Sequence, residues 1–360
     1  MLTLVPSATT KYGVKILALV LSLCTYSNSI RNCKWLYCEA ILPPPKAPWN
    51  HLFLHNNHSL FLLMTGLTRE AFDMLHKILK PPGHPSLPKR KGRKWSMTSE
   101  SQLGLFLFYI CSTLNYKYLC LIFGVTPNAC SHMLKNMLKL VVRQLCYHPL
   151  ARIKVPSPDK MQLFAVMINN REQSIDDVIG FMDGVSLKTE CTSEHVTQNA
   201  FYSGYKCDTT VNSVFTYGPD GKVFIAVINF PGSWADGSLC ARFLSSIHRR
   251  IGHYKICVDQ GFPCSGDAWN ILVGPVNERS AWRLHPTMRD YLRHVSNVYT
   301  SLRQSSEWGM RALQGSFPRF KRRLPSNRIK RRYIIQSIVH VHNFRTHVIG
   351  CNQINRVFDP

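Results

Sequence analysis

The chain has 360 residues, of which 45% are hydrophobic and 18% charged, and this ordinary globular balance excludes an intrinsically disordered protein. Lys and Arg outnumber Asp and Glu by 44 to 20, giving a formal net charge of +24; this is far more than solubility requires, so the expected partner is a polyanion, either nucleic acid or an anionic membrane surface. The 13 cysteines are odd in number and form no CxxC pair, which argues against a disulfide framework or a zinc ribbon and favours a reducing compartment.

The first 50 residues differ in composition from the rest of the chain. They contain the apolar run ILALVLSL at positions 16–23 and end in the proline cluster ILPPPKAPW, which is typical of a linker. The apolar run is too short to span a bilayer, and it is a signal peptide, a buried helix or non-native sequence at the start. The basic, cysteine-odd remainder argues against secretion, so no membrane association is expected.

Residues 51–150 carry helical patterns. Thr68 is expected to cap a helix that places Phe72, Leu75 and Leu79 on one face. A proline-rich break follows, and then an exposed basic run that either contacts phosphate or is simply solvated. The members of this run that are candidates for DNA binding are Lys89, Arg90, Lys91, Arg93 and Lys94.

A helix-turn-helix layout is predicted further along this region. A short helix covers residues 116–122, Gly124 supplies the turn and Thr126 is a possible cap. Pro127 occupies the first position of a second helix, which continues over residues 129–139. The second helix would offer four polar side chains to a DNA groove: Asn128, Ser131, His132 and Lys135. An αα-corner inside a helical domain explains the same spacing equally well.

After the proline-punctuated segment KVPSPDK the pattern changes from helices to strands. Residues 178–183 form a first strand, and a hairpin with its turn at residues 218–221 supplies the next two. A helix with Asp236 in its first turn then precedes a fourth strand at residues 254–258. The expected topology has three antiparallel strands, a crossover helix and the fourth strand beside the first.

Two of these strands end on an acid. Asp183 ends the first strand and Asp259 follows the fourth. Because paired strands lie about 5 Å apart, acids at corresponding strand ends are close enough to share a divalent cation. The alternative for Asp183 is an ordinary turn residue, since Asp-Gly is a common turn sequence.

A third carboxylate comes from a predicted helix at residues 297–317. Glu307 lies in this helix, with Arg303 and Arg311 one turn to either side. The alternative to a role in a metal site is a surface glutamate in i,i+4 ion pairs with these arginines.

From about Leu60 to Pro318 the chain resembles the PIF/Harbinger-type transposases and their domesticated relatives, members of the DDE superfamily with an RNase H-like core. The resemblance is carried, in the family's order, by the segments GFMDG, FPGSWADGSL, VDQGFP and EWGMRALQGSFPRFK. Three positions depart from the family pattern. Asp236 is followed by glycine where the family has serine, Trp308 stands where an arginine usually follows the catalytic glutamate, and Val258 precedes the second acid where some branches have glycine. None of these departures removes a carboxylate.

The resemblance implies a catalytic triad of Asp183, Asp259 and Glu307 that binds two Mg²⁺ or Mn²⁺ ions. Asp236 is a fourth metal ligand, an acid supporting the ligands, or a plain helix cap. The implied activity is cleavage, and joining, of DNA phosphodiester bonds by two-metal-ion catalysis. The alternative function is that of a domesticated, non-catalytic DNA-binding protein that retains the fold.

A second basic segment lies just beyond the Glu307 helix, where it would bring positive charge to the DNA, the alternative again being a solvated surface. Its candidate DNA-binding residues are Arg319, Lys321, Arg322 and Arg323. The resemblance also implies an oligomer for transposition and a separate Myb/SANT-like partner, and the basic runs make the nucleus the expected location.

The predicted fold class is α/β, with an RNase H-like mixed sheet flanked by helices and an N-terminal all-helical region. The expected organisation is an N-terminal segment at residues 1–50, the helical region at 51–150, the nuclease domain at 170–325 and a basic, helical tail at 326–360.

Overall fold

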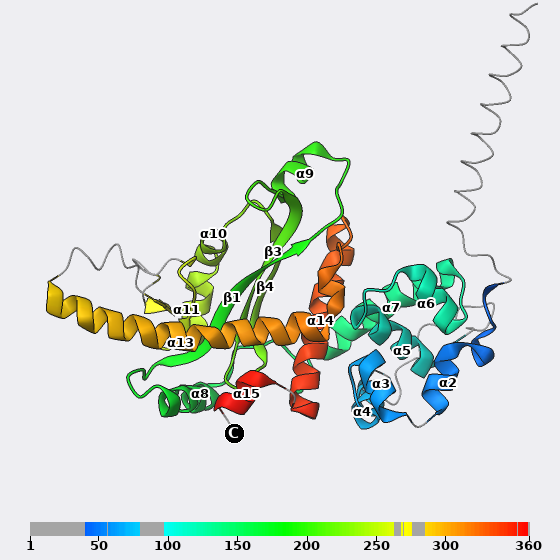
Figure 1. Cartoon of the computed structure of the whole chain (residues 1–360), viewed down its shortest axis with the longest axis horizontal. Helices are drawn as coiled ribbons and strands as arrows, with labels where there is room; N and C mark the ends of the chain where they lie inside the picture. Colours follow the sequence, from blue (N-terminus) through cyan, green and yellow to red (C-terminus); the bar gives the residue numbers. More distant parts are fainter. Residues whose placement is uncertain are drawn as a thin grey trace, which may run out of the picture.

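The structure, a computed structural model, describes residues 40–55, 57–79, 97–262, 268, 270–275, 285–350 and 352–358. It consists of a helical region and a sheet region, and helix α14 (Arg328–Ile349) lies between them (Figure 1). None of the helices in these residues combines the length and the apolar character that a membrane span requires. The apolar run at residues 16–23 lies outside the described part of the chain.

The helical region is built around a central buried helix, α5, in which every residue from Ser101 to Ile110 is buried. The Thr68 hydroxyl accepts a hydrogen bond from the Ala71 N–H at 3.3 Å, which confirms the predicted cap. The helices of this region are α2 (Pro48–Leu54), α3 (His58–Thr65), α4 (Arg69–Leu79), α5 (Ser99–Ile110), α6 (Tyr116–Phe123) and α7 (Pro127–Leu145).

The sheet has the order β4–β3–β1–β5–β6, and the short strand β2 extends the pairing of β3. Strand β3 is antiparallel to its two neighbours, β1 and β4, whereas β5 and β6 run parallel to β1. This arrangement confirms the mixed sheet. It also confirms that the strand predicted as the fourth, β5, lies beside the first, β1. The strands are β1 (Val178–Lys188), β2 (Tyr202–Ser203), β3 (Asp208–Tyr217), β4 (Val223–Pro231), β5 (Lys255–Cys257) and β6 (Leu272–Val273).

The first strand is longer than the sequence suggested. Residue Asp183 does not end it, because β1 keeps its antiparallel partner β3 as far as the pair Lys188–Thr210. The parallel partner β5 leaves earlier, and Phe181–Cys257 is the last pair on that side. Asp183 is therefore not a turn residue; it lies where β1 is still held by β3 but has lost β5.

Helices cover both faces of the sheet. Buried side chains of α8, α10 and α11 pack against one face, which carries Met182 and Val258. The long helix α13 packs against the opposite face, which carries Phe181 and Cys257, and Figure 1 shows it crossing the sheet. The helices of this part are α8 (Pro158–Arg171), α9 (His195–Phe201), α10 (Asp236–Ala241), α11 (Leu244–Ile251), α13 (Pro286–Ser316), α14 (Arg328–Ile349) and α15 (Gln353–Phe358).

Three of these helices differ from the sequence-based expectation. Helix α8 was not foreseen, since its apolar residues Met161, Phe164 and Ile168 occupy a stretch rich in polar side chains. The single helix expected after the hairpin is two, α10 and α11. Helix α13 begins well before residue 297, at Pro286, because proline is favoured at the first helical position.

Helix α14 is not a peripheral tail. Its apolar side chains, including Ile338, belong to the same buried cluster as Phe106 of the helical region and Phe181 of the sheet. The side chain of Asn343 bonds to both the N–H and the carbonyl oxygen of Val223 at 2.8 Å. This helix therefore joins the helical region to the sheet through one continuous core.

Candidate active site

The register of the parallel strands places two acids in equivalent positions. Phe181 of β1 pairs with Cys257 of β5, and Asp183 and Asp259 each lie two residues further along. Val258 still donates its N–H to the Val273 carbonyl oxygen at 2.8 Å, so the backbone stays extended up to Asp259. Because side chains alternate along a strand, both acids point to the face that carries Phe181 and Cys257.

The third acid approaches this same face from the covering helix. Residues Leu302 and Met310 of α13 are buried in the cluster that contains Phe181 and Cys257. Glu307 lies between them on the helix and remains 46% exposed. The three predicted acids Asp183, Asp259 and Glu307 therefore lie on the same side of the sheet, the side that α13 covers.

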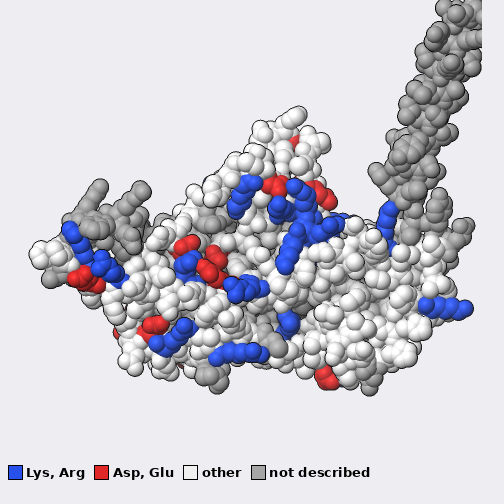
Figure 2. Space-filling view, viewed as in Figure 1, with Lys and Arg blue, Asp and Glu red and all other residues white. Residues whose placement is uncertain are grey.

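Arg303 lies between two of the acids. Its guanidinium is 2.9 Å from Glu307 Oε1 and 3.6 Å from Asp259 Oδ1. The i,i+4 pair that the sequence offered as an alternative for Glu307 is thus present, but the same guanidinium also reaches Asp259 on the sheet. Figure 2 shows carboxylates gathered around basic side chains midway along α13.

Asp183 lies against the buried Tyr217. Burial raises the pKa of the Tyr217 hydroxyl well above its usual value, and the charge of Asp183 raises it further. The hydroxyl donates to the sulfur of Met310 on α13 at 3.5 Å. Tyr217 is therefore a neutral side chain that feels the charge of Asp183 and is bonded to the helix that carries Glu307.

Asp183 and Asp259 use one carboxylate oxygen in the same way. Asp183 Oδ1 accepts the N–H of Gly184 at 2.8 Å, and Asp259 Oδ1 accepts that of Gln260 at 2.7 Å. Each bond restricts the rotation of the carboxylate, because the donor is the backbone N–H of the next residue. Preorganised carboxylates of this kind suit cation binding better than freely rotating ones.

The donor set fits a hard divalent cation in its chemistry, since Mg²⁺ and Mn²⁺ prefer carboxylate oxygens. In their present positions, no three His, Cys, Asp or Glu side chains within the described residues are close enough together to hold a metal ion. Arg303 neutralises part of the charge that such an ion would neutralise. Binding by Asp259 and Glu307 would thus require the 29%-exposed Arg303 side chain to move aside.

The fourth predicted acid is placed only by its backbone. Asp236 is the first residue of α10, as expected for an acid in the first turn of a helix. Its side chain lies outside the described part of the structure.

The helix-turn-helix candidate has the expected layout. Gly124 adopts a left-handed conformation with φ of 67° after α6, and the Thr126 hydroxyl accepts the Ala129 N–H at 3.4 Å. Helix α7 begins at Pro127, the expected first helical position, and runs to Leu145, beyond the expected end at Lys139. The four candidate DNA-binding side chains lie exposed at helical spacing on α7: Asn128, Ser131, His132 and Lys135.

The basic segment after α13 is only partly available to a ligand. Arg319 is 8% exposed, with its guanidinium 4.1 Å from the ring centre of Tyr109, so this side chain packs against the helical region and is hardly accessible to a ligand. Arg322 is exposed and donates to the side chain of Asn115. Lys321 is also exposed.

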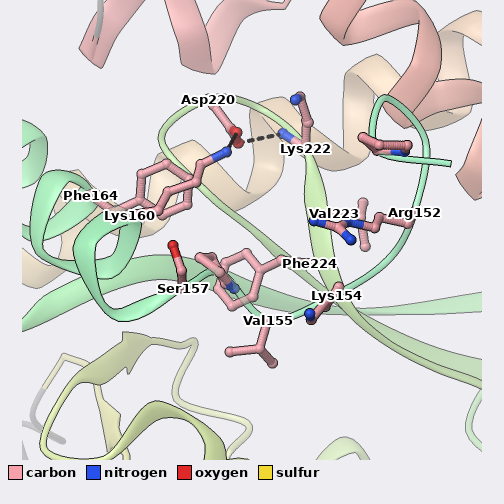
Figure 3. Close-up of a pocket in the computed structure, with 12 residues that line it drawn as sticks. Arg152, Lys154, Val155, Ser157, Lys160, Phe164, Asp220, Lys222, Val223 and Phe224 are labelled. Carbon is pink, nitrogen blue, oxygen red and sulfur yellow. Dashed lines mark hydrogen bonds and ion pairs between the residues drawn. The ribbon is translucent and has the colours of Figure 1, made fainter. Parts of the chain in front are cut away.

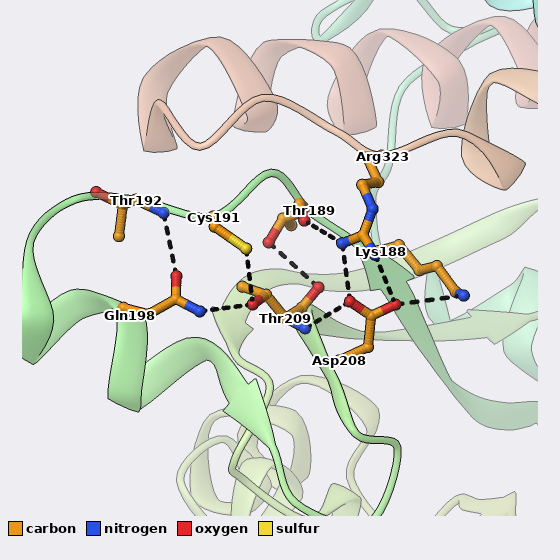
Figure 4. A network of polar contacts seen from close by, with 8 residues as sticks. All are labelled: Lys188, Thr189, Cys191, Thr192, Gln198, Asp208, Thr209 and Arg323. Atoms are coloured by element: carbon orange, nitrogen blue, oxygen red, sulfur yellow. Dashed lines mark hydrogen bonds and ion pairs between the residues drawn. The ribbon is translucent and has the colours of Figure 1, made fainter.

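Arg323 is held by a polar network at the end of the sheet (Figure 4). Its two terminal nitrogens donate to the carboxylate of Asp208 at 2.8 and 3.2 Å, and one also donates to the Thr189 carbonyl oxygen at 3.0 Å. The bonds from Arg323, with the nearby Lys188, hold the pKa of Asp208 below its usual value. Arg323 therefore fastens the basic segment to β1 and β3.

The basic run with Lys89, Arg90, Lys91, Arg93 and Lys94 lies outside the described residues.

Sequence reasoning missed the contact of Arg303 with Asp259 and the interaction of Tyr217 with Asp183. The i,i+4 spacing to Glu307 indicated that Arg303 faces the site, but its second partner depends on how α13 crosses the sheet.

Comparison with known proteins gives one match. Residues 182–343 match the family model described as DDE superfamily endonuclease, which covers less than half of the 360-residue chain. The matched stretch begins just before Asp183 and contains Asp259 and Glu307. No match was found among curated proteins or among solved structures.

Proposed function

We propose that the chain is a metal-dependent DNA endonuclease of the PIF/Harbinger transposase type, which cleaves phosphodiester bonds and joins the ends it makes. The observation that carries this proposal is the equivalent placement of Asp183 and Asp259 on two parallel strands, facing the helix that carries Glu307. The family match over residues 182–343 supports the same chemistry.

The chain's own residues would act as follows. Asp183, Asp259 and Glu307 would hold two Mg²⁺ or Mn²⁺ ions, whose chemistry is to activate a water or 3′-hydroxyl and to stabilise the leaving oxygen. The backbone N–H groups of Gly184 and Gln260 orient two of these carboxylates. The packing of α13 on the sheet sets the distance of Glu307 from them.

Positive charge on the face that carries the acids supports a DNA substrate. In Figure 2, Lys and Arg side chains gather near the start of α14 on the face that shows the acidic cluster. The exposed basic residues in the segment that leads into α14 and in its first turns are Lys321, Arg322, Arg323, Arg328 and Arg332. DNA phosphates would be attracted to these residues, while Asn128, Ser131, His132 and Lys135 of α7 would enter a groove.

A second candidate function is that of a domesticated, non-catalytic DNA-binding protein. It is favoured by the bridge of Arg303 between Asp259 and Glu307, which neutralises the acids without any metal. In either function the proposal places the protein in the nucleus, as an oligomer that acts with a separate Myb/SANT-like protein.

Replacing Asp183 by Asn distinguishes the two functions. The substitution removes a charged oxygen ligand but keeps the shape, so Mn²⁺-dependent nicking of a DNA duplex should fall at least about 100-fold while DNA affinity is kept or slightly raised. The matched control is Asp290→Asn, because Asp290 is an exposed carboxylate of α13 that is paired with Arg293 of the same helix.

Nicking should be followed on a gel with Mn²⁺ present, and binding by fluorescence anisotropy without metal. A wild-type protein that binds DNA but never nicks it would establish the non-catalytic function. Undiminished nicking by the Asp183→Asn variant would show that the catalytic site lies elsewhere.

A further inference from the structure

A basic pocket lies on the face of the sheet that carries Met182, opposite the face with the candidate active site (Figure 3). It has a volume of about 240 Å³ and lies between the segment before α8, the first turns of α8, and the hairpin between β3 and β4. Its aromatic lining, Phe164 and Phe224, belongs to the core that packs against Met182. The pocket is therefore separate from the face that carries Asp183.

The charges that line this pocket do not balance. Four cations, Arg152, Lys154, Lys160 and Lys222, line it together with a single acid, Asp220. This gives a local charge of +3 (4 − 1). Asp220 is paired with Lys160, with 2.8 Å between Nζ and Oδ2, so the other three cations have no carboxylate of their own within the described residues.

The partner of Lys222 is a histidine rather than an acid. Its Nζ lies 2.9 Å from Nδ1 of His347 on α14. Burial, and then the charges of Lys222 and Lys160, lower the pKa of His347, so the ring is neutral and accepts the bond. Burial also lowers the pKa of Lys222, with Lys160 opposing its charge and Asp220 favouring it. A bound anion would stabilise the charged form of this lysine.

The size of the pocket limits the ligand. Pockets that enclose whole small molecules usually measure about 300–1,000 Å³, so a volume of about 240 Å³ suits a phosphate group with part of its sugar. Ser157 lies at the start of the 14-residue helix α8. Its hydroxyl makes no capping bond and lines the same pocket as the exposed Arg152 and Lys154.

We propose that this pocket binds a phosphate group through Arg152, Lys154 and Lys222. The phosphate belongs either to the backbone of a DNA strand or to a small phosphate-bearing molecule, and both sources share the same recognition chemistry. Arg152 and Lys154 are exposed and provide the first contacts, whereas Lys222 is half-buried and is held from the other side by His347.

The test compares two double variants that remove equal charge. Arg152→Gln with Lys154→Gln changes the pocket, whereas Arg249→Gln with Arg250→Gln changes two exposed arginines of α11 that do not line it. A third variant, Lys222→Gln, removes the charge of the half-buried lysine that lines the pocket. The probes are a fluorescein-labelled 20-base-pair DNA duplex, followed by anisotropy in EDTA, and inorganic phosphate, followed by calorimetry.

For a DNA site, the pocket double variant should bind the duplex about tenfold more weakly than the α11 control. The slope of log Kd against log salt should also fall by roughly 1–2, because each lost phosphate contact removes about 0.9 from it. Loss of inorganic phosphate binding with unchanged duplex binding would identify a small phosphate-bearing ligand instead.

The proposal is overturned if the pocket variants and the α11 control give the same affinity for both probes. Because duplex binding is measured in EDTA and inorganic phosphate has no strand to cleave, this result is independent of whether Asp183 supports cleavage. A failed cleavage assay would likewise leave the pocket measurement unaffected.

Discussion

At the scale of single residues, the bridge made by Arg303 determines the state of the candidate active site. Its guanidinium contacts Asp259 and Glu307, which approach it from the sheet and from α13 respectively. A guanidinium and a divalent cation compete for the same carboxylate oxygens, so both cannot be held there at full strength. Arg303 thus acts as an internal counter-ion when no metal is bound.

Replacing Arg303 by Gln should tighten Mn²⁺ binding several-fold, since the competing cation is gone. The free energy of unfolding without metal should fall by less than about 1 kcal/mol, because all three side chains are partly exposed to water. Calorimetry with Mn²⁺ and urea unfolding measure these effects. Arg311→Gln is the control, being an exposed arginine one turn beyond Glu307. Equal Mn²⁺ affinity in the two variants would rule out the competition.

His342 makes stability depend on pH. Burial lowers the pKa of its imidazole to about 4, against an ordinary value near 6.5, and the charge of Arg345 acts in the same direction. Its Nε2–H donates to the Gly221 carbonyl oxygen at 3.3 Å. The folded state therefore binds fewer protons than the unfolded chain between pH 6.5 and 4, so this contribution to stability is complete above pH 6.5 and declines as the pH falls.

By pH 5 the wild-type protein should have lost about 2 kcal/mol of unfolding free energy through His342. The His342→Gln variant should lack this share of the pH dependence, whatever its stability at pH 7. Urea midpoints at pH 7 and pH 5 give the comparison, with the exposed His248→Gln as control. An unchanged difference between the two pH values in His342→Gln would contradict the assignment.

At the scale of secondary-structure elements, one glycine sets how closely α13 approaches the sheet. A Cβ at Gly309 would lie 2.8 Å from three ring atoms of the fully buried Tyr217. The ring cannot retreat, because it packs between the helix and the sheet. The absence of a side chain at position 309 therefore lets Glu307, less than one turn away, reach the acids of the strands.

The Gly309→Ala variant should lose about 1–3 kcal/mol of stability through overpacking, and its cleavage rate should fall more than its DNA affinity. Gly315→Ala in the same helix is the matched control, since nothing lies within 4 Å of its added methyl group. That variant should be as stable as the wild type or slightly more so. Thermal unfolding and the nicking assay test both; equal behaviour of the two variants would refute the close-approach argument.

At the scale of the whole molecule, α14 couples the helical region to the sheet. The Ser337 hydroxyl donates to the Leu138 carbonyl oxygen of α7 at 3.3 Å, and Asn343 holds both backbone groups of Val223 in β4. Because apolar side chains from both regions share one cluster, we expect them to unfold together.

Replacing the buried Asn343 by Ala should cost roughly 2–4 kcal/mol, because the N–H and carbonyl of Val223 lose their partner away from water. Hydrogen exchange should show the helical region and the sheet losing protection together. Asn327→Ala, which removes only the exposed cap of α14, should cost about 1 kcal/mol. Loss of protection in the sheet alone would show that the two regions unfold separately.

Local patterns were enough to predict much of this protein. The Thr68 and Thr126 caps, the turn at residues 218–221 and the fourth strand beside the first depend on neighbouring residues and simple connection rules, and the structure has them all. The motifs GFMDG and VDQGFP led to the two strand acids for the same reason. Short-range chemistry is visible in a sequence because its partners are close in the chain.

Contacts between distant segments were decided only by the tertiary structure. The sequence could not show that β1 continues past Asp183, because the length of a strand depends on how far its partner β3 follows it. It could not show that Arg319 is buried on Tyr109, that Arg323 pairs with Asp208, or that α14 is a core helix. In each case the sequence offers many possible partners for a charged or apolar side chain. Which partner it contacts depends on how the whole chain packs.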